Sequence, residues 1–146
     1  MTDALETGWA DMAAGDDGQR AGLRDYVALV AASLGIGLES CSIDQHPPMS
    51  AYVALDLALI GYPRREVALL WDERHGWSAC AETHSGEDLI VVRYRGGDVL
   101  PPPTAVQAFV EALVAGLPVG QIEPPVPTGV PGESLAQRLR HYAEEL

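Results

Sequence analysis

Apolar residues recur at helical spacing in two stretches of the chain. Over residues 19–34 they fall on one helical face, with acidic residues near the start and Gly35 just past the end, which predicts an amphipathic helix. The same pattern returns over residues 103–116, directly after two prolines. Between the first helix and the next apolar run, residues 35–50 are rich in Gly, Ser and Pro and predict a loop, with room for a short strand around residues 41–44.

Between these two helices the apolar period changes to that of β-strands. Four short apolar segments are separated by turn-rich gaps too short for a crossover helix, and they cover residues 51–59, 66–72, 77–83 and 88–95. This spacing predicts a four-stranded antiparallel meander. Alternation within the strands predicts an apolar face and a second face that admits polar side chains, namely Asp56, Ser78, Glu82, Arg93 and Arg95. The predicted fold class is therefore α+β, a two-layer sandwich with its helices on one face of the sheet.

The two ends of the chain are patterned differently from this central domain over residues 19–116. Residues 1–18 carry five acidic and no basic side chains and are interrupted by glycines, which predicts a frayed helix or a disordered arm. Residues 117–132 contain five prolines and predict a semi-rigid linker. A last amphipathic helix is predicted over residues 133–146.

The apolar stripe of that last helix consists of Leu135, Leu139, Tyr142 and Leu146. A helix of this length is barely stable in water, so we expect the stripe to be docked on another surface. The leading hypothesis is a homodimer in which two chains exchange residues 133–146. Docking on the same chain and disorder of the tail are the alternatives.

Charge and composition narrow the classes of partner. The net charge is −12, and all nine basic residues are Arg because the chain contains no Lys. The negative electrostatic potential of so acidic a chain disfavours binding to nucleic acid or to an anionic membrane surface. The apolar runs are too short to span a bilayer, and no export signal is visible, so a cytoplasmic location is expected. Cys41 and Cys80 stand far apart without a C-x-x-C pattern, as expected of reduced structural thiols.

The closest grouping of candidate acid, base and metal-ligand side chains lies at a predicted hairpin. In this hairpin, Trp71 and Trp77 flank a charged tip closed by Gly76. Asp72, Glu73 and His75 are the acid/base or metal-ligand candidates there. Neighbours in a turn diverge, however, and no second cluster completes a ligand set, so the structural interpretation is preferred. No catalytic residue, metal site or cofactor is assigned. The Gly96-Gly97-Asp98 turn is followed by prolines that lack the N–H groups of a phosphate loop.

The central part of the chain resembles a family of small actinobacterial proteins classified as a domain of unknown function. The resemblance covers roughly residues 19–116, and its most specific part is the Leu-Trp-Asp-Glu-Arg-His-Gly-Trp hairpin over residues 70–77, followed by Gly-Gly-Asp-Val-Leu-Pro at residues 96–101. It implies an actinobacterial cytoplasmic origin and carries no activity, cofactor or catalytic residue.

These observations leave three hypotheses for function. The first is a non-enzymatic protein-interaction or regulatory module, with a surface formed by Trp71, Arg74, Trp77, Arg93 and Arg95, because Trp and Arg dominate interface energetics. The second is a small-molecule-binding protein or enzyme with a cleft between helices and sheet, which convergence of His84, Glu82 or Asp56 on a cavity would favour. The third, from acidity alone, is an inhibitor that mimics nucleic acid.

Overall fold

The computed structural model describes residues 3–83, 85, 88–126 and 134–145. The chain divides into two compact units, one formed by residues 1–27 and 130–146 and the other by residues 28–129. A long helix, α1 (Asp3–Ser33), begins in the first unit and ends in the second, and a short 3₁₀ helix, η1 (Leu38–Ser40), follows it.

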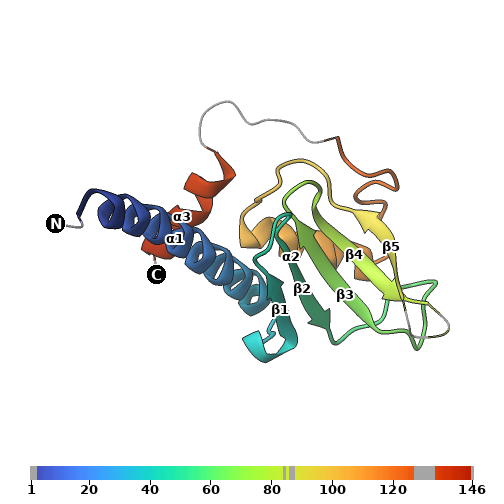
Figure 1. Cartoon of the computed structure of the whole chain (residues 1–146). Helices are drawn as coiled ribbons and strands as arrows, with labels where there is room; N and C mark the ends of the chain where they lie inside the picture. The colour runs from blue at the N-terminus through green and yellow to red at the C-terminus, as the bar shows by residue number, and fades with distance from the viewer. Residues whose placement is uncertain (1–2, 84, 86–87, 127–133, 146) are drawn as a thin grey trace. The chain divides into compact units, whose positions relative to one another are not determined.

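The second unit is built on a five-stranded antiparallel sheet (Figure 1). The strands pair in chain order, and they are β1 (Cys41–Asp44), β2 (Ser50–Leu55), β3 (Val67–Asp72), β4 (Gly76–Glu82) and β5 (Leu89–Tyr94). The predicted antiparallel meander is confirmed, but the number of strands was wrong. The short segment at residues 41–44 pairs with β2 over four residues, from Cys41 opposite Val53 to Asp44 opposite Ser50, and becomes an edge strand.

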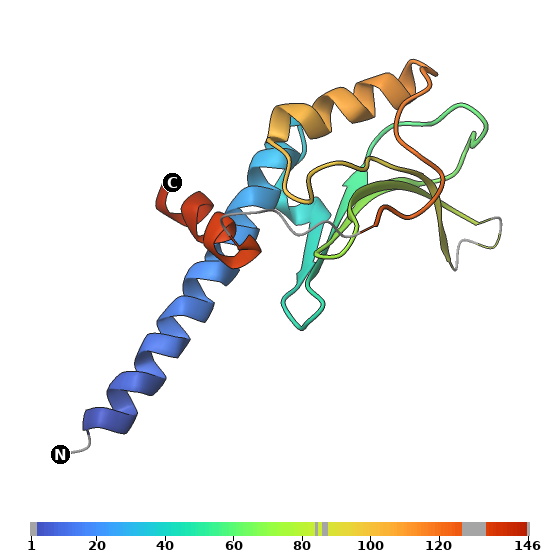
Figure 2. The same ribbon diagram turned by 90° about the horizontal axis from the view of Figure 1, so that it is seen from above.

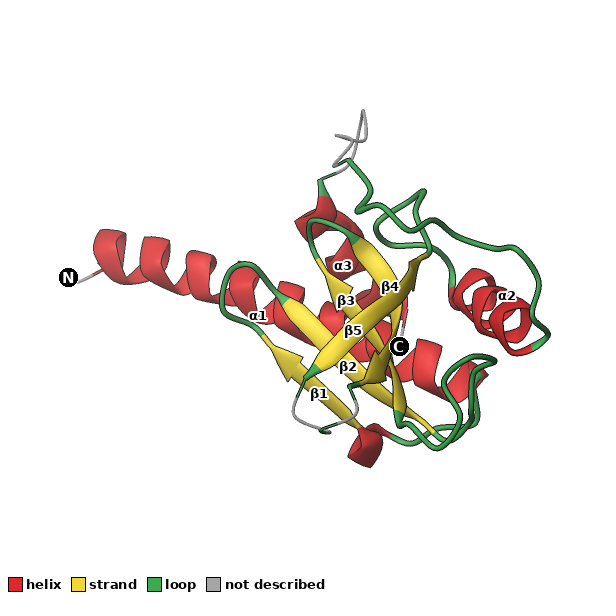
Figure 3. Ribbon diagram, turned by 90° about the vertical axis from the view of Figure 1, so that its right-hand side faces the viewer, coloured by secondary structure: helices red, strands yellow, loops and turns green. Residues whose placement is uncertain are grey.

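One face of this sheet forms the core of the unit. Val53, Leu69 and Ala79 lie opposite one another on three adjacent strands and are almost completely buried. Helix α2 (Pro103–Val114) lies on one side of the sheet and buries Val106, Phe109 and Val110 (Figures 1 and 3). Its first residue is a proline, which the first turn of a helix tolerates because the N–H there has no partner within the helix.

A β-bulge in β5 moves two arginines from the face on which they were expected. Ala79 pairs with Arg93 and Cys80 pairs with Val91, so β5 has one extra residue at this point. Without that residue Arg93 would lie opposite Ser78, the place that Tyr94 takes in the structure. The prediction that Arg93 and Arg95 share a face with Ser78 was therefore wrong, because a one-residue slip sends each later side chain to the other face.

The first part of the predicted Pro-rich linker lies against the sheet. Tyr94 of β5 and Gln121 exchange two backbone hydrogen bonds, each of 2.8 Å, outside the main ladder. Gly120 has a φ of +75°, and a Cβ at this position would overlap the carbonyl oxygen of Tyr94. Glycine is thus required both by the backbone conformation and by the close approach to β5.

In the first unit, α1 extends further than expected. The helix begins at Asp3 instead of near residue 19, so the predicted separate arm over residues 1–18 is helical in the structure from Asp3 on. Gly8, Gly15 and Gly18 suggested an interruption, but each glycine costs a helix only about 1 kcal/mol, and no proline stands between Asp3 and Ser33.

The last helix, α3 (Leu135–Glu145), packs beside α1 of the same chain (Figure 2). Leu139 and Leu23 are fully buried, and the rings of Tyr26 and Tyr142 meet edge to face with centroids 4.8 Å apart. The Ser134 hydroxyl accepts a hydrogen bond from the Gln137 N–H, and the Gln137 side chain accepts one from the Ser134 N–H, which is a capping box. Of the predicted stripe, Leu146 lies outside the described residues.

The two helices approach each other closely at Gly22, and this contact leads to a first prediction. A Cβ at Gly22 would overlap the carbonyl group of Leu139, whereas a Cβ at Gly18 would touch only the flexible Arg140 side chain, 3.3 Å from its Cγ. We expect Gly22→Ala to lower the free energy of unfolding by about 1–3 kcal/mol, because the backbone of α3 has to move. Gly18→Ala is the matched control and should be neutral or slightly stabilising, since alanine favours helix.

Urea unfolding measures the stability of both variants, and tryptic cleavage after Arg138 and Arg140 reports the docking of α3 locally. Faster cleavage is expected in Gly22→Ala alone. Equal stability and equal cleavage in the two variants would contradict the close helix contact.

Candidate functional site

The two hairpin tryptophans belong to the core and not to the surface. Trp71 and Trp77 lie directly opposite each other on β3 and β4, and each is 1% exposed. The indole Nε1 of Trp71 donates a 2.7 Å hydrogen bond to the carbonyl oxygen of Val99, which satisfies the one polar group of that ring. Because both rings are buried, the folded domain cannot present them to a partner.

The carboxylates at the hairpin tip are used to hold its backbone. Oδ1 of Asp72 accepts hydrogen bonds from the N–H groups of Arg74 (2.8 Å) and His75 (2.7 Å), while its Oδ2 lies 3.1 Å from Nδ1 of His75. Glu73 turns the other way, and its Oε1 accepts the N–H of Met49 at 3.2 Å. Among the described residues, no three His, Cys, Asp or Glu side chains gather in a group that could hold a metal ion.

The three arginines predicted to bind a partner lie at the hairpin tip and near the end of β5. Arg74 is exposed at the hairpin tip, whereas Arg93 and Arg95 lie near the end of β5 and are half-buried. The guanidinium groups of Arg93 and Arg95 donate to the carbonyl oxygens of Val92 and Gly96, at 2.8 and 3.0 Å. Of the five residues of the predicted surface, the two tryptophans are in the core, and the three arginines lie outside it.

The face of the sheet turned away from α2 is the larger candidate surface. We call it the open face, and it carries the partly exposed side chains Tyr52, Leu70, Glu82 and Tyr94. In Figure 1 this face is turned to the viewer, and no helix of residues 28–126 lies over it. Small side chains at Ala68, Ser78 and Cys80 fill the places between the larger ones, and these three are buried.

Two carboxyl groups meet at one end of the open face. Glu66 and Glu82 are adjacent, since the Glu82 N–H donates to the Glu66 carbonyl oxygen at 2.9 Å and their side-chain carboxyls share a hydrogen bond. Partial desolvation, the charge of Glu66 and that hydrogen bond raise the pKa of Glu82. Burial, followed by the charges of Glu66 and Glu82, also raises the pKa of the Tyr52 hydroxyl.

The cysteine on this face is not set up as a nucleophile. Burial raises the pKa of the Cys80 thiol, against the opposing hydrogen bond from Ser78, whose Oγ lies 3.8 Å from the sulfur. A protonated, buried thiol is a poor nucleophile. Cys41, whose thiol pKa burial also raises, is likewise free and partly exposed on β1.

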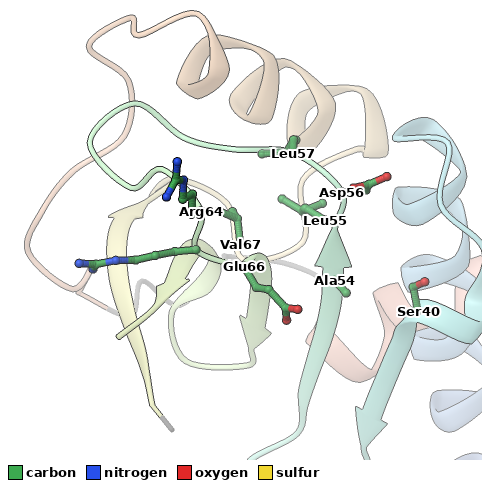
Figure 4. A pocket seen from close by; sticks show the side chains of 9 residues that line it. Ser40, Ala54, Leu55, Asp56, Leu57, Arg64, Glu66 and Val67 are labelled. Carbon is green, nitrogen blue, oxygen red and sulfur yellow. The ribbon is translucent and has the colours of Figure 1, made fainter. Parts of the chain in front are cut away.

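A cavity of about 410 Å³ opens where β2 ends and β3 begins (Figure 4). We call it the loop cavity, and it is lined by both charge signs, with Asp56 and Glu66 opposed to Arg64 and Arg65, together with Ser40, Ala54, Leu55, Leu57 and Val67. In Figure 4 the side chains of Asp56 and Ser40 lie on one side of β2 and Glu66 on the other. Of the residues expected to converge on a cleft, Asp56 lines the cavity, Glu82 does not, and His84 lies outside the described residues.

Arg64 is the lining residue with unusual backbone geometry. Its φ is +61°, and among the described residues no other non-glycine residue has a positive φ. An L-residue in this region costs about 1–2 kcal/mol compared with its ordinary conformation. Strain of this kind collects at functional sites, so Arg64 is the feature of the cavity that points to a ligand.

The outer edge of β5 is an apolar surface that the sequence interpretation missed. Leu89, Ile90 and Val91 are exposed to 37, 39 and 40%, and β5 is the last strand of the sheet. The sequence does contain a signal for this exposed edge. The last strand of a meander is an edge strand, and this one carries four consecutive apolar residues without a proline or lysine.

Comparison with known proteins adds a family. A model described as "Family of unknown function (DUF6292)" matches residues 26–112. No curated protein and no solved structure matches the chain. In the part of the chain that the structure describes, no helix is long and apolar enough to cross a membrane.

The carboxyl pair leads to a prediction of pH dependence. A carboxyl with a raised pKa in the folded state adds stability below its ordinary pKa of 4.5 and loses that contribution as the pH rises through the folded value. We therefore expect Glu82→Gln to raise the Tm at neutral pH, since it removes the repulsion with Glu66, and to have no such effect at acid pH. Thermal unfolding across this range measures the difference, with the exposed Glu123→Gln as control. A gain that is independent of pH would rule out the carboxyl pair as its cause.

The strained arginine gives a prediction about stability. Replacement of Arg64 by glycine should stabilise the domain by up to about 1 kcal/mol, since relief of the positive φ exceeds the entropy that glycine adds to the unfolded chain. The neighbouring Arg65→Gly should destabilise it, because φ there is not positive and the guanidinium that lies 5.7 Å above the Tyr62 ring is lost. Denaturant unfolding of both variants decides, and a loss of stability in Arg64→Gly would show that the conformation carries no strain.

Proposed function

The chain belongs to the family of unknown function DUF6292, and we propose that it is a non-enzymatic protein-interaction or regulatory module whose binding surface is the open face. The observation that carries the proposal is that α2 covers one face of the sheet while the other presents Tyr52, Leu70 and Tyr94 partly exposed. Tyrosine is enriched at protein interfaces because it combines a large apolar ring with a hydroxyl.

The chemistry of the open face supports binding more than catalysis. The Cys80 thiol is buried and protonated, and the carboxylates of Asp72 and Glu73 are occupied by backbone N–H groups of the hairpin and of Met49. The two tyrosines instead form a surface next to Leu70, with Glu82 at its margin. Such a combination of aromatic centre and charged rim is typical of protein interfaces.

A second candidate function is small-molecule binding in the loop cavity, and the strained Arg64 is the observation that favours it. The volume of about 410 Å³ lies at the small end of the range of roughly 300–1,000 Å³ for ligand sites. Both charge signs in the lining fit a small ligand that carries a cationic and an anionic group.

The open face is tested by capture of a partner on the immobilised full chain from an extract of the native organism. We expect a specific polypeptide to be retained by the wild-type chain and lost in Leu70→Asp, because the new charge lies in the centre of the open face. Val126→Asp is the matched control, since Val126 is 80% exposed outside that face, and it should retain the partner.

Circular dichroism of the variants establishes that they fold. Retention of the same partner by folded Leu70→Asp would refute the open face as the binding surface. A small molecule found by native mass spectrometry on the wild-type chain, and lost in Arg64→Gly, would favour the second function.

A further inference from the structure

Between Leu89 and Val92, β5 has the extended backbone of an edge strand, to whose outer side a further strand can pair. In the described part of the chain, β5 pairs with β4 on its inner side, and on its outer side with Gln121 opposite Tyr94. An edge of this kind is the template to which extended peptides add as a further strand.

The direction of the backbone groups along β5 follows from its backbone hydrogen bonds. Asp88 and Arg95 bond inward to the β4 side, through the Thr83 N–H and the Trp77 carbonyl oxygen at 2.9 Å each, whereas Tyr94 bonds outward to Gln121. Backbone groups alternate in direction along an antiparallel strand, and the bulge beyond Val91 inserts one residue into this alternation. Leu89 and Val91 therefore direct their N–H and C=O groups away from the sheet.

The segment of the chain that follows α2 pairs with this edge at Gln121. Continued antiparallel pairing from Gln121 would bring Pro124 and Pro125 beside the middle of β5. Proline has no N–H to donate to a ladder, so the chain's own segment is chemically unsuited to extend the pairing.

Charge and area identify the kind of partner. A second copy would bring two chains of net charge −12 together, and three partly exposed side chains supply little of the roughly 1,000 Å² that a stable interface needs. Acidic groups flank the edge instead, because Glu82 is the register partner of Leu89, Glu66 is hydrogen-bonded to Glu82, and Asp88 is exposed where β5 begins.

We propose that β5 accepts, as a sixth strand, an extended segment of a basic partner protein, with an apolar side chain beside Val91 and Lys or Arg side chains toward Asp88 and Glu82. The inference rests on the proposed function in requiring a protein partner, but it places main-chain recognition at the edge and not on the open face. Backbone hydrogen bonds supply the contact, and charge supplies the selection.

A synthetic peptide with a valine-rich centre flanked by lysines, labelled for fluorescence anisotropy, tests the edge with the full chain. We expect saturable binding below about 1 mM, at least about tenfold weaker binding of the same peptide with glutamate in place of lysine, and a similar loss when its backbone nitrogens are methylated. In the protein, Val91→Pro removes an outward N–H without touching the ladder to β4, whereas Val91→Ala keeps that N–H and is the control.

Binding weakened about tenfold by Val91→Pro and less than about threefold by Val91→Ala would support strand addition. If Val91→Pro does not fold, the methylated peptide on the wild-type chain decides. Lack of saturable binding, or equal binding of the acidic or methylated peptide, would overturn the proposal, as would a wild-type dimer that Val91→Pro dissolves. If the peptide does not bind while the open face still captures a partner, the edge proposal is refuted and the proposed function is not.

Discussion

The burial of two indole rings is the interaction on which the β-sheet unit depends. Trp71 and Trp77 face each other across the central hairpin in a core made mainly of Val, Leu and Ala, and they are the largest of its fully buried side chains. Loss of one such ring typically costs a core about 3–5 kcal/mol. The hydrogen bond from Trp71 to Val99 also attaches to the hairpin the segment that leads into α2, so the same ring helps to position the covering helix.

The parts of the fold that could be predicted are those with strong local signals. The hairpin at residues 70–77 was recognised because a tryptophan stands on each side of a polar turn, and Gly76 has the positive φ, +70°, that this turn needs. Helix α2 was found from its apolar period. The start of α1 was misplaced because glycines were taken as an end signal, although their cost of about 1 kcal/mol each is small for a helix of 31 residues.

The features that could not be predicted depend on residues far apart in the sequence. The bulge in β5 is a property of the pairing between two strands, and no local pattern shows which residue is the extra one. Tyr52, Glu66 and Glu82 meet only through the register of three strands, so their mutual effect on pKa was invisible in the sequence. The two tryptophans were placed on a binding surface because their type was weighed without their burial, which the register decides.

The shortness of the free edge on β5 has a consequence for the lifetime of any complex formed there. Between Asp88 and the Gln121 contact, Leu89 and Val91 turn their backbone groups outward, so an added strand gains about four hydrogen bonds. At about 0.5–1.5 kcal/mol each, these bonds amount to only a few kcal/mol, before the entropy lost by ordering the peptide is subtracted. Complexes of that strength dissociate within a fraction of a second. Because Gln121 already pairs with Tyr94, only this short stretch accepts a strand, which makes the edge a place for brief, repeated encounters and not for permanent assembly.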